Sequence, residues 1–395
     1  MKPSLNARGT LIDIAQRLGV SVATVSNAFN RPDQLSAKLR EKILATARSM
    51  NYGGPNPAAR MLRTGFSGTI GVVYPDTLLR PFEHPVAAAL LGGIADACAE
   101  RGLALLLLRG GEQSLKIIRN AAVDGLIVFS LPKNDLTLET VKERSLPMVI
   151  IDQPRLPNVP VVGIDERASA RACAEHLMAL GHKRFAIVTF RLGADGYCGL
   201  IDRNRVKNSC YELNRIRVST YLDVLDKGGP EVSVKIWEWR RSDEEGGRIA
   251  GENLLQEHPR PTAILATSDS LAIGVIEAAR ACKVRVPEDL AVTGFDDIPA
   301  AKMITPQLTT IRQPIAEKGR LAVAALLKED GPLRIMVPTK LIIRQSSDPA
   351  RLGSTQETEI EVRAHPPSAP KQHRRNERPY QDRAKATSQG GGASR

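Results

Sequence analysis

From Gly68 onward, short apolar segments alternate with amphipathic stretches, and this alternation restricts the possible folds more than any other feature of the sequence. The stretches between the apolar segments, such as VAAALLGGIADACAE and SARACAEHLMALG, carry apolar residues at helical spacing. Strands that alternate with helices form parallel sheets built from βαβ units, and the number of strands here indicates two sheets. The predicted strands are TIGVVY, LALLLL, GLIVFS, PMVIID, RFAIVTF, TAILAT and LAVTGF. We therefore predict two doubly wound parallel-sheet α/β subdomains.

Residues 1–54 show a different pattern, that of an all-α helix-turn-helix unit. In LIDIAQRLGVSVATVSNAF, Ala15 provides the small side chain that two crossing helices need, and Gly19 follows four residues later, where a tight turn needs positive φ. Ser21 is placed to cap the second helix. An ordinary helical hairpin is the alternative, but it does not explain the combined spacing of Ala15, Gly19 and Ser21.

The outward face of the second predicted helix is small and polar, as a helix lying in a DNA major groove requires. An asparagine amide can pair with an adenine edge, which suits Asn27, and small apolar side chains such as Val22 or Ala23 can contact a thymine methyl. In the alternative interpretation, Thr24 and Ser26 are incidental surface residues. The predicted DNA-binding residues of this helix and its cap are Ser21, Val22, Ala23, Thr24, Ser26 and Asn27.

The positive charge of the chain is unevenly distributed. The net charge is +12, and residues 1–65 hold ten Lys/Arg against only Asp13, Asp33 and Glu41. Such an excess suits contacts with DNA phosphates, although a basic terminal segment is often only a solvated face. Residues 347–395 are rich in Ser, Pro, Gln, Arg and Gly, and we predict a disordered tail there.

Several function classes have no support in the sequence. No GxGxxG follows the first strand, and no Walker lysine, nucleophile elbow or HExxH motif is present, so we predict neither an enzyme nor a cofactor. The five cysteines lack metal-like spacing, and we predict no metal; pairing or metal binding by Cys198 and Cys210 is the alternative. With no signal peptide and no apolar run long enough to span a membrane, we expect a cytoplasmic protein.

The segment TLIDIAQRLGVSVATVSNAFNRPDQLSAKLREKILATARSMNY resembles the headpiece of the LacI/GalR family of repressors, and the resemblance continues to about Ser346. It implies that Val22, Ala23 and Asn27 choose the operator, whereas Thr24 and Ser26 contact the DNA backbone or pack. It also implies a two-subdomain sensor like that of periplasmic binding proteins. The expected domains are a headpiece at 1–54, a hinge at 55–67 and a sensor at 68–346, with an N-subdomain at about 68–162 and 292–320 and a C-subdomain at about 163–291 and 321–346.

The predicted hinge contains NPAARMLRTG, which by itself indicates only a weak linker helix. The resemblance implies a helix that forms when two subunits pair on the operator. Ala59 and Arg60 then match minor-groove positions, and Leu62 matches a leucine wedged between bases. An apolar wedge costs a few kcal/mol of unstacking and is offset by the extra contacts of a bent duplex. The alternative is that Leu62 packs against its own domain.

Polar residues follow the predicted strands of the sensor, where the carboxyl ends of two sheets would form a ligand cleft. The resemblance assigns ligand contacts to Asp296 in TGFDDIPAAKM, to Arg217 at a helix start, and to Phe82 as an aromatic that stacks on the effector. An arginine–aspartate pair suits a small polyhydroxylated or weakly anionic ligand. Each aspartate could instead cap the following helix. The predicted effector-binding residues are Asp76, Phe82, Gln153, Arg217, Asp269 and Asp296.

One stretch departs from the family pattern. Residues 191–214 are expanded, start at the expected cleft mouth and would reshape or cover the pocket. Trp237 and Trp239 offer rings that could stack on a sugar, although burial on a strand edge is the alternative.

Together these features predict a transcription regulator that binds double-stranded operator DNA as a homodimer, with a tetramer as the alternative. A small metabolite, by default a sugar, would control it, and we expect a repressor. A periplasmic sugar-binding receptor is the rival, because its fold resembles the sensor; the headpiece and the missing export signal argue against it.

Overall fold

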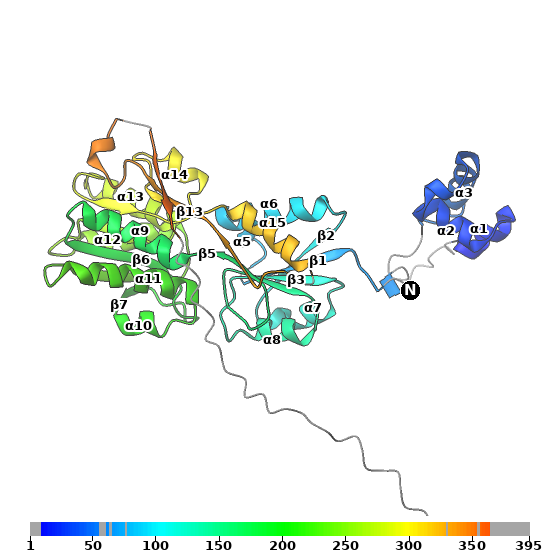
Figure 1. The fold of residues 1–395 in the computed structure, drawn as a ribbon, viewed down its shortest axis with the longest axis horizontal. Helices are drawn as coiled ribbons and strands as arrows, with labels where there is room; N and C mark the ends of the chain where they lie inside the picture. Colours follow the sequence, from blue (N-terminus) through cyan, green and yellow to red (C-terminus); the bar gives the residue numbers. More distant parts are fainter. Residues whose placement is uncertain are drawn as a thin grey trace, which may run out of the picture.

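The computed structural model describes residues 9–54, 61–62, 65–75, 77–328, 331–353 and 356–363. Figure 1 shows a small helical headpiece and a two-lobed α/β domain. No helix in these ranges is long and apolar enough to cross a membrane.

The headpiece consists of three helices around a small apolar core. A capping box between Thr10 and Asp13 starts the first helix, and Gly19, with φ of 67°, ends it. The core is formed by Ile14, Ala15, Val25, Ala28, Ile43 and Ala47. The helices are α1 (Leu11–Leu18), α2 (Val22–Asn30) and α3 (Ala37–Ser49), with the short 3-10 turn η1 (Pro32–Gln34) before α3.

The first lobe is built on a six-stranded, wholly parallel sheet with the order β12-β5-β4-β3-β1-β2. Its helices are α5 (Arg80–Glu83), α6 (Pro85–Ala99), α7 (Leu115–Asn120), α8 (Leu136–Glu143) and α15 (Ile315–Leu326), with η2 (Glu112–Ser114) before α7. Its strands are β1 (Thr69–Tyr74), β2 (Ala104–Arg109), β3 (Gly125–Phe129), β4 (Met148–Ile151), β5 (Val161–Ile164) and β12 (Arg334–Val337).

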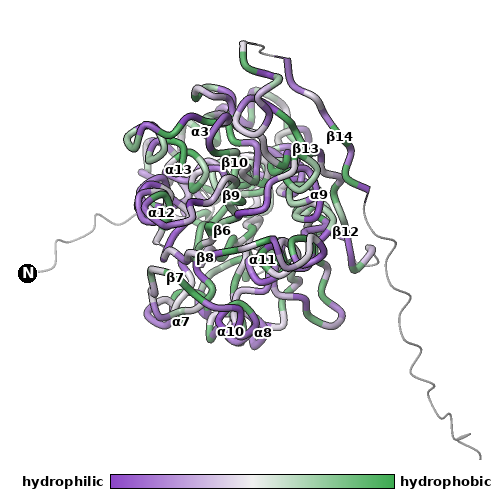
Figure 2. The backbone as a smooth tube through the Cα atoms, turned by 90° about the vertical axis from the view of Figure 1, so that its left-hand side faces the viewer, coloured by the Kyte–Doolittle hydropathy of each residue, from purple (hydrophilic) through white to green (hydrophobic). Residues whose placement is uncertain are grey.

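The second lobe is built on a five-stranded sheet with the order β10-β9-β6-β8-β7, parallel except for the edge strand β7. Figure 2 shows the apolar segments around the central strands β6 and β9, with more polar segments on outer helices such as α12. The strands are β6 (Arg184–Phe190), β7 (Gly199–Ile201), β8 (Ser233–Trp239), β9 (Ala263–Ala266) and β10 (Ala291–Thr293). The helices are α9 (Glu166–Ala179), α10 (Arg203–Lys207), α11 (Glu212–Leu225), α12 (Glu244–Leu255), α13 (Asp269–Ala281) and α14 (Pro299–Met303), with η3 (Asp226–Gly228) after α11.

The fold thus contains the two parallel-sheet subdomains that the sequence predicted, but the predicted subdomain boundaries are wrong at the C-terminal crossings. Strand β10 pairs with β9 in the second sheet, so residues 292–313 do not belong to the first lobe. Helix α15 instead packs against α6, where Gly93 and Gly319 allow close backbone approach; a Cβ added at Gly93 would lie 1.9 Å from the Ala316 carbonyl oxygen. Strand β12 then pairs with β5, which places residues 334–337 in the first lobe as well.

A third sheet, not predicted from the sequence, is antiparallel and has the order β11-β13-β14. Its strands are β11 (Thr310–Arg312), β13 (Thr339–Ile343) and β14 (Thr358–Val362), with η4 (Pro349–Arg351) between the last two. Strand β14 and η4 contradict the prediction that disorder begins at residue 347. The prediction misses β14 because TEIEV is short, largely exposed and follows a mostly polar stretch; its pairing with β13 comes from the fold. Residues 364–395 lie outside the described part of the chain.

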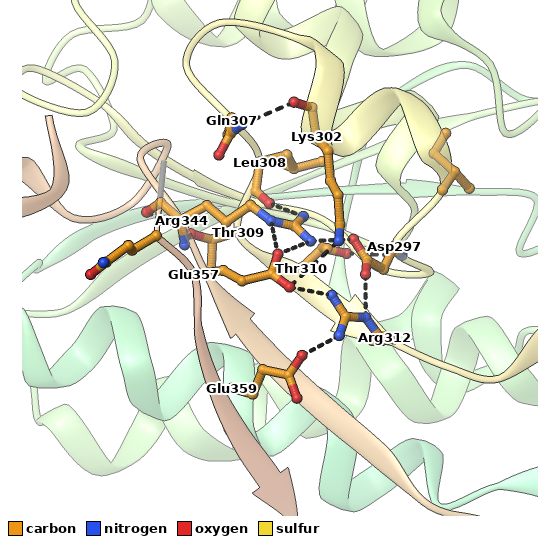
Figure 3. Close-up of polar contacts among 12 residues, drawn as sticks. Asp297, Lys302, Gln307, Leu308, Thr309, Thr310, Arg312, Arg344, Glu357 and Glu359 are labelled. Carbon is orange, nitrogen blue, oxygen red and sulfur yellow. Dashed lines mark hydrogen bonds and ion pairs between the residues drawn. The ribbon is translucent and has the colours of Figure 1, made fainter. Parts of the chain in front are cut away.

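Partly buried ion pairs attach β14 and the preceding Glu357 to the second lobe, as Figure 3 shows. The Arg344 side chain, 1% exposed, donates to Asp297 at 2.7 Å and to Glu357 at 2.9 Å. Arg312 also contacts Asp297, Glu357 and Glu359. Although burial opposes it, hydrogen bonds from Arg312 and Arg344 lower the pKa of Glu357 to about 2.

Candidate functional sites

A cavity of about 110 Å³ lies between the two lobes, where the carboxyl ends of strands from both sheets meet. The first lobe contributes residues that follow β1, β3 and β4, and the second contributes residues from β6, from α11 and from the segment after β8. The lining residues are Tyr74, Pro75, Arg80, His84, Val86, Ala87, Phe129, Ser130, Asp152, Phe190, Arg191, Leu213, Arg217, Arg241, Ser242, Asp296 and Gln313. The rings of Tyr74 and Phe129 stack with centroids 5.6 Å apart.

Arg217, on α11, is held rigidly in the cavity wall. Its Nε donates to Glu166 Oε2 at 2.6 Å and its Nη1 donates to the Thr267 carbonyl oxygen at 2.8 Å. The guanidinium lies 3.6 Å from the centroid of the Phe295 ring. Burial of a charge is tolerated only when it is paired and hydrogen-bonded, and here Glu166 neutralises the arginine from outside the cavity.

A polar network joins the lobes across the floor of the cavity. Lys318, on α15, donates to Asp152 Oδ1 at 2.7 Å and to Gln313 Oε1 at 2.8 Å. Gln313 in turn donates through Nε2 to Asp296 Oδ1 at 2.6 Å. Burial raises the pKa of Asp296 to about 8, although Arg217 acts in the opposite direction, so this side chain is mostly protonated at neutral pH and can donate a hydrogen bond to a ligand.

The mouth of the cavity is basic, and there the two lobes touch. Arg80 Nη2, from α5, donates to the Ser242 carbonyl oxygen at 2.5 Å, and His84 Nε2 lies 3.3 Å from the Ser242 hydroxyl oxygen. Burial and the nearby Arg80 lower the pKa of His84 to about 4, so its imidazole is neutral. Arg191 and Arg241 line the same cavity from the second lobe.

The structure brings two of the six predicted effector residues, Arg217 and Asp296, into the cavity wall. Asp76 lies outside the described residues. Phe82 is 74% exposed and does not line the cavity; its chain neighbours Arg80 and His84 do.

Gln153 and Asp269 are not in the cavity wall either. Gln153 accepts a hydrogen bond from the Leu213 backbone N–H at 2.7 Å and so ties α11 to the first lobe. Asp269 is buried and accepts from Thr310 Oγ1 at 2.5 Å and from the Ile298 backbone N–H at 2.8 Å, a role in supporting the Asp296 loop. Burial raises its pKa to about 7.

Sequence reasoning missed Arg80, His84, Lys318 and Gln313. RPFEHP offered a signal, because it places an arginine and a histidine on either side of an aromatic residue, after the carboxyl end of the first strand. Lys318 and Gln313 lie on either side of the point where the chain crosses between the lobes. The sequence analysis placed that crossing elsewhere, and no local motif marks the two residues.

The expanded stretch 191–214 does not cover the cavity. Only its ends, Arg191 and Leu213, line it, while β7 pairs with β8 and α10 packs against α11. Arg205 pairs with the buried Glu238 and with Asp195 at 2.8 Å, which fixes the stretch in place. The two tryptophans of β8 are also absent from the cavity wall, and neither indole N–H has a hydrogen-bond partner among the described residues.

The headpiece presents α2 as the second helix of a helix-turn-helix. Ser21 caps it by accepting from the Thr24 backbone N–H at 3.0 Å. Val22, 43% exposed, and Ala23 point to solvent at its start, whereas Thr24, Ser26 and Asn27 are half-buried. Asn27 Nδ2 donates to Gln34 Oε1 at 3.1 Å, which orients its amide.

Of the predicted hinge residues, Ala59 and Arg60 lie outside the described residues. Leu62 is described, and its side chain is 84% exposed. It therefore does not pack against its own domain in this structure.

Across the described ranges, no group of three or more His, Cys, Asp or Glu side chains is placed to hold a metal ion. The cavity can bind a small polar molecule through hydrogen bonds and charge. The headpiece can present the start of α2 to a nucleic-acid groove.

Comparison with known proteins agrees with this arrangement. Residues 10–56 match the profile of bacterial regulatory proteins of the lacI family, and residues 174–347 match a periplasmic binding protein-like domain. An HTH-type transcriptional regulator of Mycobacterium tuberculosis is 38% identical over 360 residues, which cover 88% of this chain and 99% of that protein.

Two solved structures extend the comparison. A LacI-family regulator from Corynebacterium glutamicum has a TM-score of 0.64 at 32% identity, with 87% of this chain and 99% of that chain covered. The regulator CelR in complex with cellobiose has a TM-score of 0.59 at 25% identity, with 86% of this chain and 100% of that chain covered.

A helix-turn-helix joined to a two-lobed, periplasmic-binding-protein-like domain with a central cavity defines a ligand-sensing, DNA-binding transcriptional regulator. The chain belongs to the LacI family of bacterial transcriptional regulators. The resemblance and the fold class predicted from the sequence are thereby confirmed.

Proposed function

We propose that this regulator is a repressor that binds a near-palindromic operator as a dimer and changes its DNA affinity when a small hydroxylated metabolite enters the cavity between the lobes. The observation that carries the proposal is the cavity itself, whose wall is shared by both lobes and contains rigidly held polar groups. A ligand that contacts both walls changes the relative stability of lobe orientations, and through them the spacing of two headpieces.

The polar groups favour a sugar-like effector. Asp296 and Gln313 can exchange hydrogen bonds with hydroxyls, while the stacked pair Tyr74 and Phe129 offers apolar ring surface. The CelR structure, which contains cellobiose, supports a carbohydrate by analogy. On the DNA side, Val22, Ala23 and Asn27 would choose the bases, and Leu62 would enter the minor groove at the operator centre.

The proposal is tested by selecting bound duplexes from a random library, with and without a panel of sugars and other metabolites. We expect a palindromic consensus whose binding shifts with one compound. A lack of any duplex preference, with ligand binding intact, would favour a ligand-binding protein whose headpiece no longer reads DNA.

A further inference from the structure

The charged residues of the cavity divide into a compensated floor and an uncompensated mouth. At the floor, Arg217 is paired with Glu166 and Asp152 is paired with Lys318. These groups therefore require no charge from a ligand. The remaining acid of the wall is Asp296. Burial raises its pKa to about 8, so it is mostly protonated at neutral pH.

At the mouth, two of the positive charges, Arg80 and Arg241, lack such a partner among the described residues. Both side chains line the cavity, and neither forms an ion pair with a carboxylate in the described part of the chain. Arg80 lies near enough to lower the pKa of His84, and Asp243 acts on the same ring in the opposite sense. Arg80 and Arg241 therefore supply positive charge at the mouth from both lobes.

These cations come from opposite walls that already touch. Arg80 belongs to the first lobe and reaches the Ser242 carbonyl oxygen, and Arg241 is the chain neighbour of Ser242 in the second lobe. An anionic group placed between the two guanidinium groups would thus bind both lobes at once. Guanidinium groups bind phosphate and carboxylate through paired, charge-assisted hydrogen bonds.

We infer that the effector is a hydroxylated anion, whose phosphate or carboxylate group is held between Arg80 and Arg241 while its hydroxyls face Asp296 and Gln313. The inference rests on the proposed function and narrows it from sugars in general to sugar phosphates or sugar acids. The positive charge at the mouth then selects an anionic ligand and holds the two lobes together through it. The floor, whose charges are paired, recognises the hydroxyl pattern of the ligand.

The test is calorimetric titration of the full chain with matched compounds: a neutral sugar, its phosphate ester and its uronic acid, beginning with glucose, glucose 6-phosphate and glucuronate and extending to pentose and other hexose sets. We expect the charged member of one set to bind at least about tenfold more tightly than the neutral one. The phosphate and carboxylate arms show which anion the site takes.

Arg80→Ala and Arg241→Ala should each remove most of that preference. Arg240→Ala is the matched control, because Arg240 is adjacent in sequence but lies over the Trp239 ring and does not line the cavity. It should leave the preference unchanged. Arg241 is exposed, so its variant keeps the test valid if Arg80→Ala fails to fold.

Three results would overturn the inference: neutral members binding as tightly as charged ones in every set, the preference surviving in both arginine variants, or no charged compound binding. Duplex selection reports separately on the proposed function. A neutral sugar that binds the cavity and shifts operator affinity would leave the proposed function standing and reject only the anionic effector.

Discussion

Arg217 and Glu166 form a buried ion pair in which the guanidinium faces the cavity between the lobes and the carboxylate lies behind it, with Nε–Oε2 and Nη2–Oε1 distances of 2.6 and 3.2 Å. The pair joins α11 to the start of α9 and fixes the position of the arginine before any ligand arrives. A ligand that meets a preorganised group loses less free energy to ordering it.

Glu166→Gln should destabilise the protein strongly, because it leaves the Arg217 charge buried without its counter-ion. Removing one partner of a buried pair costs about 3–5 kcal/mol. The free energy of unfolding, measured by urea denaturation, checks this expectation. Glu139→Gln is the control: it breaks the exposed Lys142–Glu139 pair and should cost about 1 kcal/mol or less. Equal effects of the two substitutions would contradict the role given to the buried pair.

Asn27→Ala should relax the choice of one base in each half-site and weaken binding to the preferred operator by about 1–3 kcal/mol. The Gln34 contact holds the amide in place, so the loss is one of oriented hydrogen bonds. Competition binding with operators varied at single positions measures it. Asn30→Ala, at the far end of α2, is the comparison and should leave base preference intact. An unaltered preference in the Asn27 variant would exclude this residue from readout.

Leu62→Ala should reduce operator bending and affinity while leaving effector affinity as it is. The side chain is 84% exposed in the free protein, so its removal disturbs no folded core. Fluorescence energy transfer across a labelled duplex reports the bend. Ile117→Ala, an exposed apolar residue on α7 in the sensor, should not change it. Persistent bending without Leu62 would rule out its action as a wedge.

Asp296→Asn should flatten the dependence of stability on pH. The folded-state pKa of Asp296 is raised by burial to about 8, whereas the unfolded carboxyl titrates near 4, so the folded state holds the extra proton between these values. The free energy of unfolding of the parent protein therefore falls as pH rises towards 8.

The measurement is best made from pH 6.5 to 8.5, above the range in which His84, with its lowered pKa, contributes. Asp269 has a pKa raised to about 7 and adds a slope of the same sign, so Asp269→Asn is the companion variant. A slope in the Asp296→Asn protein as steep as that of the parent would argue against a protonated Asp296.

Glu357→Gln should lower the free energy of unfolding by about 1–3 kcal/mol, because the buried Arg344 loses a charge-assisted hydrogen-bond partner. Glu361→Gln is the matched control, because Glu361 is exposed and lies four residues further along, on β14. Thermal and chemical unfolding of the two variants distinguish them. Were both substitutions neutral, the Arg344–Glu357 pair would contribute nothing measurable to stability.

Local sequence patterns were sufficient to predict the helices and strands and the helix-turn-helix of the headpiece. The helix-turn-helix depends on short-range requirements, a small residue at Ala15, positive φ at Gly19 and a cap at Ser21, so nearby residues encode it. Strand and helix periodicity likewise predicted the two parallel sheets, because each segment must bury one face. The carboxyl ends of those strands indicated where a cavity would form, and Arg217 and Asp296 line it.

Which residues meet in that cavity was decided by the tertiary structure. Phe82, Gln153 and Asp269 have side chains suited to a ligand, yet none lines the cavity. Phe82 is exposed to solvent, Gln153 forms a hydrogen bond between the lobes, and Asp269 supports the loop that carries Asp296. Arg80 and Ser242 meet across the mouth although 162 positions separate them. The sequence by itself determines the helices and strands, because propensity and periodicity act over a few residues. The chain crossings near residues 314 and 338 instead decide which distant side chains meet, and they therefore decide the charge of the cavity.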